Sequence, residues 1–154
     1  MRLMGRLADR SSWVTHGTCP IEKTMKVVGS RNAMLTMREA FYGTARFDDF
    51  AEAVGMSDAT TAANLKALVS AGLLEKRPYR DAGARTRAEY VLTQAGEDLM
   101  PVVFGLFDWG MRHAAEPPPL VLRHEGCAHD VGVRMVCECG AQPQPDEMEL
   151  RVSH

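Results

Sequence analysis

The hydrophobic positions between residues 57 and 96 change their spacing twice, which predicts a helix, two strands and the start of another helix. Ser57 offers an N-cap hydroxyl, and Gly72 supplies a C-terminal stop. Between them, apolar side chains recur at the three- and four-residue spacing of one helix face: Ala62, Leu65, Leu68 and Val69. The opposite face carries only small or polar side chains: Ala59, Thr60, Ala63 and Lys66. These small side chains would let the helix approach another molecule closely.

Two extended segments are expected after this helix. Leu73 and Leu74 begin the first, and the β-favouring residues Tyr90 to Leu92 form the return strand. From residue 76 to residue 87 the chain carries five basic side chains against one acid, Asp81: Lys76, Arg77, Arg80, Arg85 and Arg87. An isolated basic hairpin is usually a solvated surface, but a capped helix directly before it is the order of a winged helix-turn-helix. In that fold the helix enters the DNA major groove and the hairpin reaches neighbouring phosphates.

Three shorter helices are expected before residue 57: Pro20 to Val28, Arg31 to Phe41 and Phe47 to Val54. Glycines interrupt the chain between them. Ile21, Met25 and Val28 share one face of the first, and Phe47, Phe50, Ala51 and Val54 are expected to face inward in the third. The second contains the apolar residues Met34, Leu35, Met37 and Phe41. The methionine-rich faces are expected to be core, because methionine fills irregular gaps well.

The segment after the hairpin predicts a long helix, capped by Thr93 and reaching about Ala115. Pro101 predicts a bend or an offset start. Apolar residues cover much of the circumference of this helix: Leu99, Val102, Val103, Leu106, Phe107, Trp109 and Met111. One domain core needs only one apolar stripe, so a second partner is expected, namely the same helix of another subunit. Such a homodimer would present two helices to a palindromic operator.

Length and charge place these elements in one main domain. Of the 154 residues, 1–18 form an N-terminal arm, 19–115 the winged helix-turn-helix, and 116–154 a Pro-rich linker and a tail. The net charge of −2 argues weakly against a nucleic-acid binder, but residues 1–113 hold 15 basic and 13 acidic side chains, whereas 114–154 hold 3 and 7. The hairpin therefore keeps a local positive field. No long apolar run or signal-peptide core is present, so a cytoplasmic protein without a membrane partner is expected.

The order of short motifs between residues 19 and 113 resembles the HxlR-type transcriptional regulators, winged-helix relatives of the MarR group. The matching motifs are Cys19-Pro20, Arg38-Glu39, Phe47-x-x-Phe50, Leu65-x-x-Leu68 with Ala71-Gly72-Leu73, and Glu89-Tyr90-x-Leu92-Thr93-x-x-Gly96. The resemblance implies a homodimeric DNA-binding regulator, with the N-terminal segment and the final helix at the dimer interface. Two departures stand out: Asn32 replaces a usual tryptophan, and Ala63 and Asn64 replace usual basic residues.

The fold class expected is therefore α+β and mainly α: a winged helix-turn-helix with a long C-terminal dimerisation helix and a small tail containing cysteine and histidine. The function expected is a homodimeric, sequence-specific, DNA-binding transcriptional regulator. Its candidate DNA contacts come from the helix and the hairpin: Ser57, Thr60, Asn64, Lys66, Arg80, Arg85 and Arg87. Because the helix carries little charge, affinity is expected to rest on the hairpin and on dimerisation.

Cys19 is the candidate redox-sensing residue. It precedes Pro20, at the expected N-cap of the first helix, where the partial positive charge of the helix end stabilises a thiolate. Some proteins of the family that this chain resembles sense oxidants or electrophiles at this position. The alternatives are therefore a redox or effector switch, in which Cys19 forms an intersubunit disulfide or an adduct, and an inert cysteine with a packing role.

The tail carries five soft or borderline metal ligands: Cys127, His129, Cys137 and Cys139, with His124 as an alternative. Thiolate and imidazole suit tetrahedral zinc, and a small tail gains stability from a metal. Only one residue separates Cys137 from Cys139, which strains chelation by both. No cofactor is certain, and the alternatives are zinc, copper or another soft metal, or a thiol-rich tail without metal.

Two other functional classes were weighed against a DNA-binding regulator. The first is a metal- or redox-dependent protein interaction module that uses the winged helix as a dimer scaffold. The second is an enzyme, which the sequence disfavours because it contains no Gly-rich phosphate loop and no Cys-x-x-Cys pair. His16 and His113 are isolated and have no catalytic partner nearby in the sequence.

Overall fold

In the computed structural model, which describes residues 1–12, 19–79 and 87–152, the chain divides into two units. One unit spans Ile21–Leu120, and the other combines Met1–Pro20 with Val121–His154. The first is called the helical unit below and the second the terminal unit. Among the described residues, no helix is both long enough and apolar enough to cross a membrane.

The four helices that begin the helical unit follow the sequence prediction closely. They are α1 (Pro20–Val28), α2 (Arg31–Phe41), α3 (Phe47–Val54) and α4 (Asp58–Ser70). The Ser30 side chain caps α2, and the Ser57 side chain caps α4. Gly55 ends α3 in the left-handed region with φ of +71°, a conformation that glycine adopts without a steric penalty. Local capping signals therefore set these boundaries.

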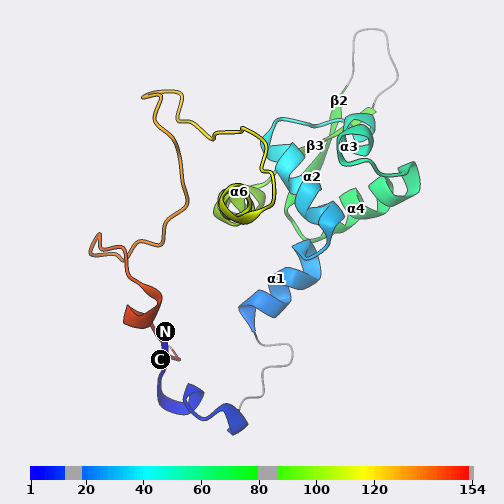
Figure 1. The fold of residues 1–154 in the computed structure, drawn as a ribbon. Coiled ribbons are helices and arrows are strands. Elements are labelled where there is room, and N and C mark those ends of the chain that lie inside the picture. Colours follow the sequence, from blue (N-terminus) through cyan, green and yellow to red (C-terminus); the bar gives the residue numbers. More distant parts are fainter. Residues whose placement is uncertain (13–18, 80–86, 153–154) are drawn as a thin grey trace. The chain divides into compact units, whose positions relative to one another are not determined.

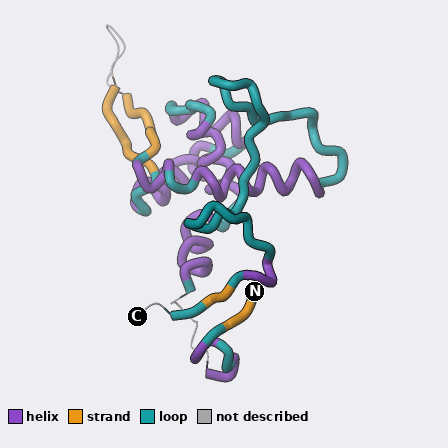
Figure 2. The backbone as a smooth tube through the Cα atoms, turned by 90° about the vertical axis from the view of Figure 1, so that its left-hand side faces the viewer, coloured by secondary structure: helices purple, strands orange, loops and turns teal. Residues whose placement is uncertain are grey.

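The predicted hairpin is also present. Strand β2 (Leu74–Tyr79) pairs antiparallel with β3 (Arg87–Leu92), in a register that runs from Leu74 opposite Leu92 to Tyr79 opposite Arg87. In Figures 1 and 2 the hairpin extends away from the helices that pack at its base. Arg80 and Arg85 belong to its tip, which lies outside the described residues.

The core of the helical unit lies where α2, α3, α4 and the hairpin meet. The Phe50 and Tyr90 rings pack edge to face with centroids 6.4 Å apart. Other core side chains come from α1, α2, α4, β2 and α6: Val28, Ala33, Met37, Ala40, Leu65, Leu68, Leu74 and Val103. In α4, the prediction that Ala62 faces the core is wrong, because Ala62 is exposed and Thr61 is fully buried. Thr61 tolerates burial because its hydroxyl donates to the Ser57 carbonyl at 3.0 Å.

The long helix predicted from Thr93 to Ala115 is divided into two helices, α5 (Gln94–Glu97) and α6 (Met100–His113). Pro101 occupies the first turn of α6, so its offset-start alternative is confirmed. The Thr93 hydroxyl caps α5 by accepting from the Gly96 N–H at 3.1 Å. Gly96 is buried so tightly that a Cβ atom there would lie 2.1 Å from the Leu73 carbonyl oxygen.

The terminal unit joins segments that the sequence analysis treated as a separate arm and tail. Strand β1 (Arg2–Leu3) pairs parallel with β4 (Glu149–Leu150), and three 3₁₀ helices accompany them: η1 (Gly5–Leu7), η2 (Arg10–Ser12) and η3 (Pro145–Glu147). An isolated bridge between Arg123 and Asp130 closes a turn in the tail. Figure 2 shows the two strand pairs as separate sheets.

Candidate nucleic-acid interface

The outer face of α4 is smooth and carries little charge. Thr61, Leu65 and Leu68 turn inward and are buried. The exposed side is largely alanine, with Thr60, Lys66 and the acidic Asp58 of the first turn as its functional groups: Asp58, Ala59, Thr60, Ala62, Ala63, Lys66 and Ala67. Small side chains allow a helix backbone to approach a groove closely, and Lys66 supplies the one cation on α4.

The beginning of α4 presents two hydroxyl groups in a fixed arrangement. The Ser57 Oγ accepts from the Thr60 N–H at 3.3 Å and lies 2.9 Å from the Thr60 Oγ1. Both side chains are exposed. A helix N-terminus of this kind, with its partial positive charge, suits a phosphate group. Ser57 and Thr60 thus stand together where the sequence prediction placed DNA contacts.

Asn64, the third predicted contact on α4, turns toward α2. Its amide nitrogen donates to the fully buried Thr36 hydroxyl at 2.7 Å and to the Asn32 carbonyl oxygen at 3.4 Å. Two of the three positions at which the sequence departs from the resembled family, Asn32 and Asn64, therefore lie side by side. Asn64 links the helix to its support, so Thr60 and Lys66 are the side chains of α4 better placed for an external contact.

The basic side chains of the hairpin differ in how accessible they are to another molecule. Glu75 forms an ion pair with Arg77 at 3.2 Å, and its hydrogen bond and charge raise the pKa of Arg77. Lys76 lies 5.9 Å from the centre of the Tyr90 ring. Arg87 is exposed at the start of β3. Of the predicted hairpin contacts, Arg87 is described here, whereas Arg80 and Arg85 lie outside the described residues.

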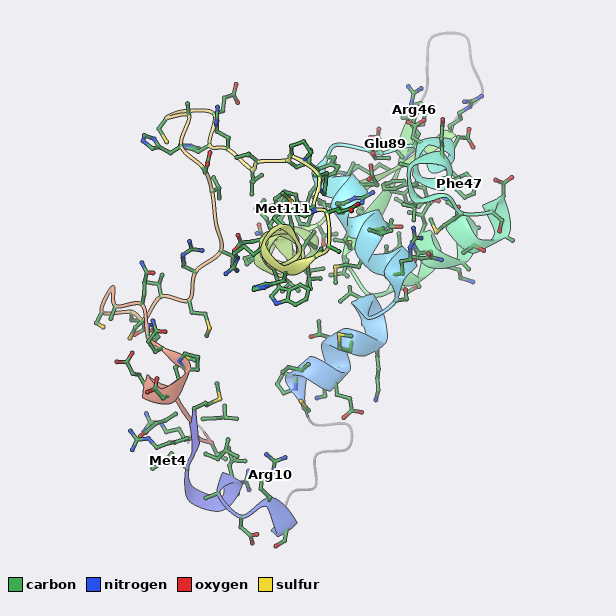
Figure 3. All side chains as sticks on the ribbon, in the orientation of Figure 1. Met4, Arg10, Arg46, Phe47, Glu89 and Met111 are labelled. Carbon is green, nitrogen blue, oxygen red and sulfur yellow. The ribbon has the colours of Figure 1, made fainter. Side chains whose placement is uncertain are left out.

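A basic residue that the sequence analysis missed, Arg46, lies at the base of the hairpin. It precedes α3, and its backbone forms an isolated antiparallel β-bridge with Glu89 of β3. Its guanidinium lies 5.1 Å from the centre of the Tyr79 ring. Figure 3 shows Arg46, Phe47 and Glu89 gathered where α3 meets the hairpin. A cavity of about 360 Å³ there is lined by Arg46, Phe47, Asp48, Asp49, Tyr79, Arg87, Ala88 and Tyr90. Arg46 was not predicted as part of this site, because it lies 41 positions before Arg87 in the sequence.

One side of α6 is apolar and exposed within the helical unit. Val103 is buried against the core, but Val102, Leu106 and Trp109 are 47%, 52% and 59% exposed. These three residues are called the α6 stripe below. In α1, Ile21 and Met25 are exposed as well, although the sequence pattern grouped them with the buried Val28. A row of exposed apolar side chains on one helix face is typical of an interaction site.

Beside the α6 stripe, α2 and α6 enclose an open groove of about 250 Å³. Its lining is mainly apolar, with Arg38 and Tyr42 as its polar members: Met34, Leu35, Arg38, Tyr42, Val103, Phe104, Leu106 and Phe107. The Phe41, Phe104 and Phe107 rings form a chain of contacts with centroid distances of 5.8 and 6.4 Å. The groove is suited to an apolar or aromatic group.

The structure places Cys19 directly before α1, as predicted, with a partly buried free thiol. In the tail, the predicted zinc ligands separate into pairs. His124 Nδ1 lies 3.1 Å from the Cys127 Sγ, and Cys137 and Cys139 share a turn in which the Gly140 N–H donates to the Cys137 carbonyl oxygen. His129, the fifth predicted ligand, is joined to His124 through the backbone, where the His124 N–H donates to the His129 carbonyl oxygen at 2.9 Å. Within the described ranges, no three His, Cys, Asp or Glu side chains gather in a way that could hold a metal ion. The residues as arranged do not fit the predicted site, and zinc binding stays a prediction.

The helical unit contains the residues that match a known protein family. The family model described as HxlR-like helix-turn-helix matches residues 27–117. The chain is 35% identical to the uncharacterized HTH-type transcriptional regulator Rv3095 of Mycobacterium tuberculosis over 125 residues, which cover 79% of this chain and 78% of that protein.

Two solved structures, both titled as candidate transcription factors, are similar over most of the chain. PA1607 has a TM-score of 0.77 and 26% identity, covering 89% of this chain and 95% of its own. PA1374 of Pseudomonas aeruginosa has a TM-score of 0.62 and 30% identity, covering 88% of this chain and 92% of its own. With its winged helix, the chain thus belongs to the HxlR-like helix-turn-helix family and is a transcriptional regulator of the helix-turn-helix type.

Proposed function

We propose that the chain acts as a homodimer that binds a palindromic DNA operator in a sequence-specific manner. The observation that carries this proposal is the smooth exposed face of α4 directly beside a basic hairpin. The helix enters the major groove, and the hairpin follows the flanking backbone. Arg87 contacts phosphates there, together with Arg80 and Arg85 of the hairpin tip.

The side chains of α4 divide into two roles in this proposal. Thr60 and Lys66 face outward, so they contact base edges, and a lysine there suits guanine acceptors in the major groove. Ser57 contacts a phosphate at the helix N-terminus. Asn64 keeps its hydrogen bond to Thr36 and contributes to DNA binding chiefly by fixing the helix, although its amide oxygen can still accept a hydrogen bond from a base.

The exposed α6 stripe supports dimerisation through α6. Its apolar residues recur at the four- and three-residue spacing of a helix face and remain exposed within the helical unit. A second copy of the same helix would cover them in an isologous contact. Two α4 helices related by that symmetry would match an operator with two half-sites.

The test of the hairpin is the double variant Arg85→Ala and Arg87→Ala, measured by fluorescence anisotropy on fragments of the chain's own promoter region. Loss of two phosphate contacts is expected to weaken binding at least about tenfold at low salt. It should also reduce the slope of log affinity against log salt by about 2, similarly for all fragments. Arg77→Ala is the matched control, because Arg77 lies on the same hairpin but is paired with Glu75.

An unchanged affinity and salt slope in the double variant would remove the hairpin from the proposal. If the wild-type chain bound no promoter fragment at low salt but captured a protein partner in the presence of zinc, the alternative function would be favoured. That alternative is a metal- or redox-dependent protein interaction module that uses the winged helix as a dimer scaffold.

A response to oxidants or electrophiles through Cys19 is the regulatory part of the proposal. Its support is a partly buried free thiol directly before a helix. Two Cys19 thiols of a dimer and one peroxide molecule would yield an intersubunit disulfide and two waters. Promoter binding is expected to fall when wild-type protein is oxidised and to stay constant in Cys19→Ser. Equal loss of binding in both proteins, or no loss in the wild type, would exclude Cys19 as the sensor.

A small apolar effector is the other signal compatible with the fold. The groove between α2 and α6 offers aromatic and methionine side chains around about 250 Å³, with Arg38 as a polar member. Leu106 belongs both to this groove and to the α6 stripe. A ligand there would therefore act on dimer geometry and, through it, on the spacing of the two α4 helices.

A further inference from the structure

The two cysteines at residues 137 and 139 lie in a tight turn of the terminal unit. The Cys137 N–H donates to the Ala141 carbonyl oxygen at 2.8 Å, and the Gly140 N–H donates to the Cys137 carbonyl oxygen at 2.8 Å. Gly140 has φ of +87°, which a residue with a side chain adopts only with strain. The turn is therefore closed by backbone hydrogen bonds around Cys139.

This turn holds Cys137 and Cys139, which are two residues apart, close together. The Cys139 sulfur accepts hydrogen bonds from the Ala141 N–H and from the Cys137 thiol, which lower the pKa of Cys139. Both cysteines are free and exposed. Cys127, by contrast, lies against the His124 ring, and its thiol is not part of this pair.

The spacing suits a disulfide better than a zinc site. Residues two apart lie within about 7 Å even in an extended chain, and disulfides join Cα atoms that are about 4.4 to 6.8 Å apart. Because no third ligand of the described residues joins the pair, a metal would lack the remainder of its coordination shell. The arrangement thus contains all the groups that a two-thiol reaction needs.

We propose that Cys137 and Cys139 form a redox-active dithiol that closes to a disulfide within one chain when it meets a peroxide. The Cys139 thiolate attacks one peroxide oxygen, the O–O bond breaks, and the product is a sulfenic acid with release of water or hydroxide. The Cys137 thiolate then attacks the Cys139 sulfur, and a second water leaves. Overall, two thiols and one hydrogen peroxide become one disulfide and two waters, and an external thiol reverses the change.

The experiment uses the full chain, reduced and then treated with hydrogen peroxide, blocked with N-ethylmaleimide and digested with trypsin. Cleavage after Arg134 and Arg151 releases residues 135–151, which contain Cys137 and Cys139 as their only cysteines. This peptide is expected to lose about 2 Da on oxidation, the mass of two hydrogens, and to take no maleimide. Dithiothreitol should restore two maleimide sites.

Cys139→Ser and Cys137→Ser are expected to abolish the mass loss, whereas Cys127→Ser should leave it unchanged. The proposal would be overturned if peptide 135–151 still took two maleimides after peroxide treatment. It would also be overturned if either cysteine were linked to the peptide carrying Cys127, or if both thiols were shielded by stoichiometric zinc in the purified chain. Because the readout is the thiol state, the result does not depend on DNA binding or on Cys19.

Discussion

Replacing Gly96 with alanine is expected to destabilise the helical unit by about 2 to 3 kcal/mol, since the added atom has no room. The new Cβ would lie 2.1 Å from the Leu73 carbonyl oxygen and 3.1 Å from the Leu92 side chain. The Leu73 oxygen cannot move freely, because it accepts hydrogen bonds from the Thr93 N–H at 3.1 Å and the Thr93 hydroxyl at 3.3 Å. Relief of the clash would break the junction between the hairpin and α5.

The measurement is equilibrium unfolding in urea, followed by circular dichroism. Gly110→Ala is the matched control, because Gly110 lies inside α6 with no atom within 4 Å of the added Cβ. Alanine there should be neutral or stabilise by up to about 1 kcal/mol. If Gly96→Ala unfolds at the wild-type urea concentration, the close packing of α5 against the end of α4 and β2 is not a determinant of stability.

Leu106→Glu is expected to convert the protein to a monomer and to weaken operator binding by about 100-fold or more, since two linked half-sites bind with an avidity that one half-site lacks. Leu106 lies at the centre of the α6 stripe and is 52% exposed within one chain. A dimer would bury it against the partner helix, where an unpaired carboxylate is costly. Sedimentation velocity measures the assembly, and anisotropy on a promoter fragment measures the affinity.

Leu120→Glu is the control for this variant, because Leu120 is similarly exposed at 54% but lies beyond the end of α6. It should remain a dimer with wild-type affinity. Circular dichroism separates loss of assembly from loss of folding. A Leu106→Glu protein that is folded and still dimeric would show that α6 is not the dimer interface, while the DNA-binding proposal for α4 would remain open to its own test.

Helix boundaries were predictable because their signals are local. Ser57 caps α4 and Gly55 ends α3, as the sequence indicates, and each effect acts within a few residues. The hairpin was predictable for the same reason, since the first strand, which contains Leu74, and the return strand, which contains Tyr90, are close in sequence. The exposure of Thr60 and Lys66 on α4 follows from the helical period.

One error on α4 arose because hydrophobicity was a poor guide to burial, and the others arose where neighbours distant in sequence decided the outcome. Ala62 and Thr61 are adjacent on α4, and hydrophobicity favoured Ala62 as the buried one. Burial instead fell on Thr61, because its hydroxyl is satisfied by the Ser57 carbonyl within the helix. The partnership of Asn64 with Thr36 and the position of Arg46 beside the hairpin depend on packing between α2, α3, α4 and β3.

The sequence by itself determined the order of helices, the hairpin and the family of this protein, because period, caps and turn residues act over short distances. The tertiary structure decided that Asn64 of α4 turns inward and that Gly96 must lack a side chain. These features depend on atoms brought together by folding: the Leu73 carbonyl against Gly96, and Thr36 against Asn64. Contacts of this kind depend on three-dimensional distance, which the spacing along the chain does not encode.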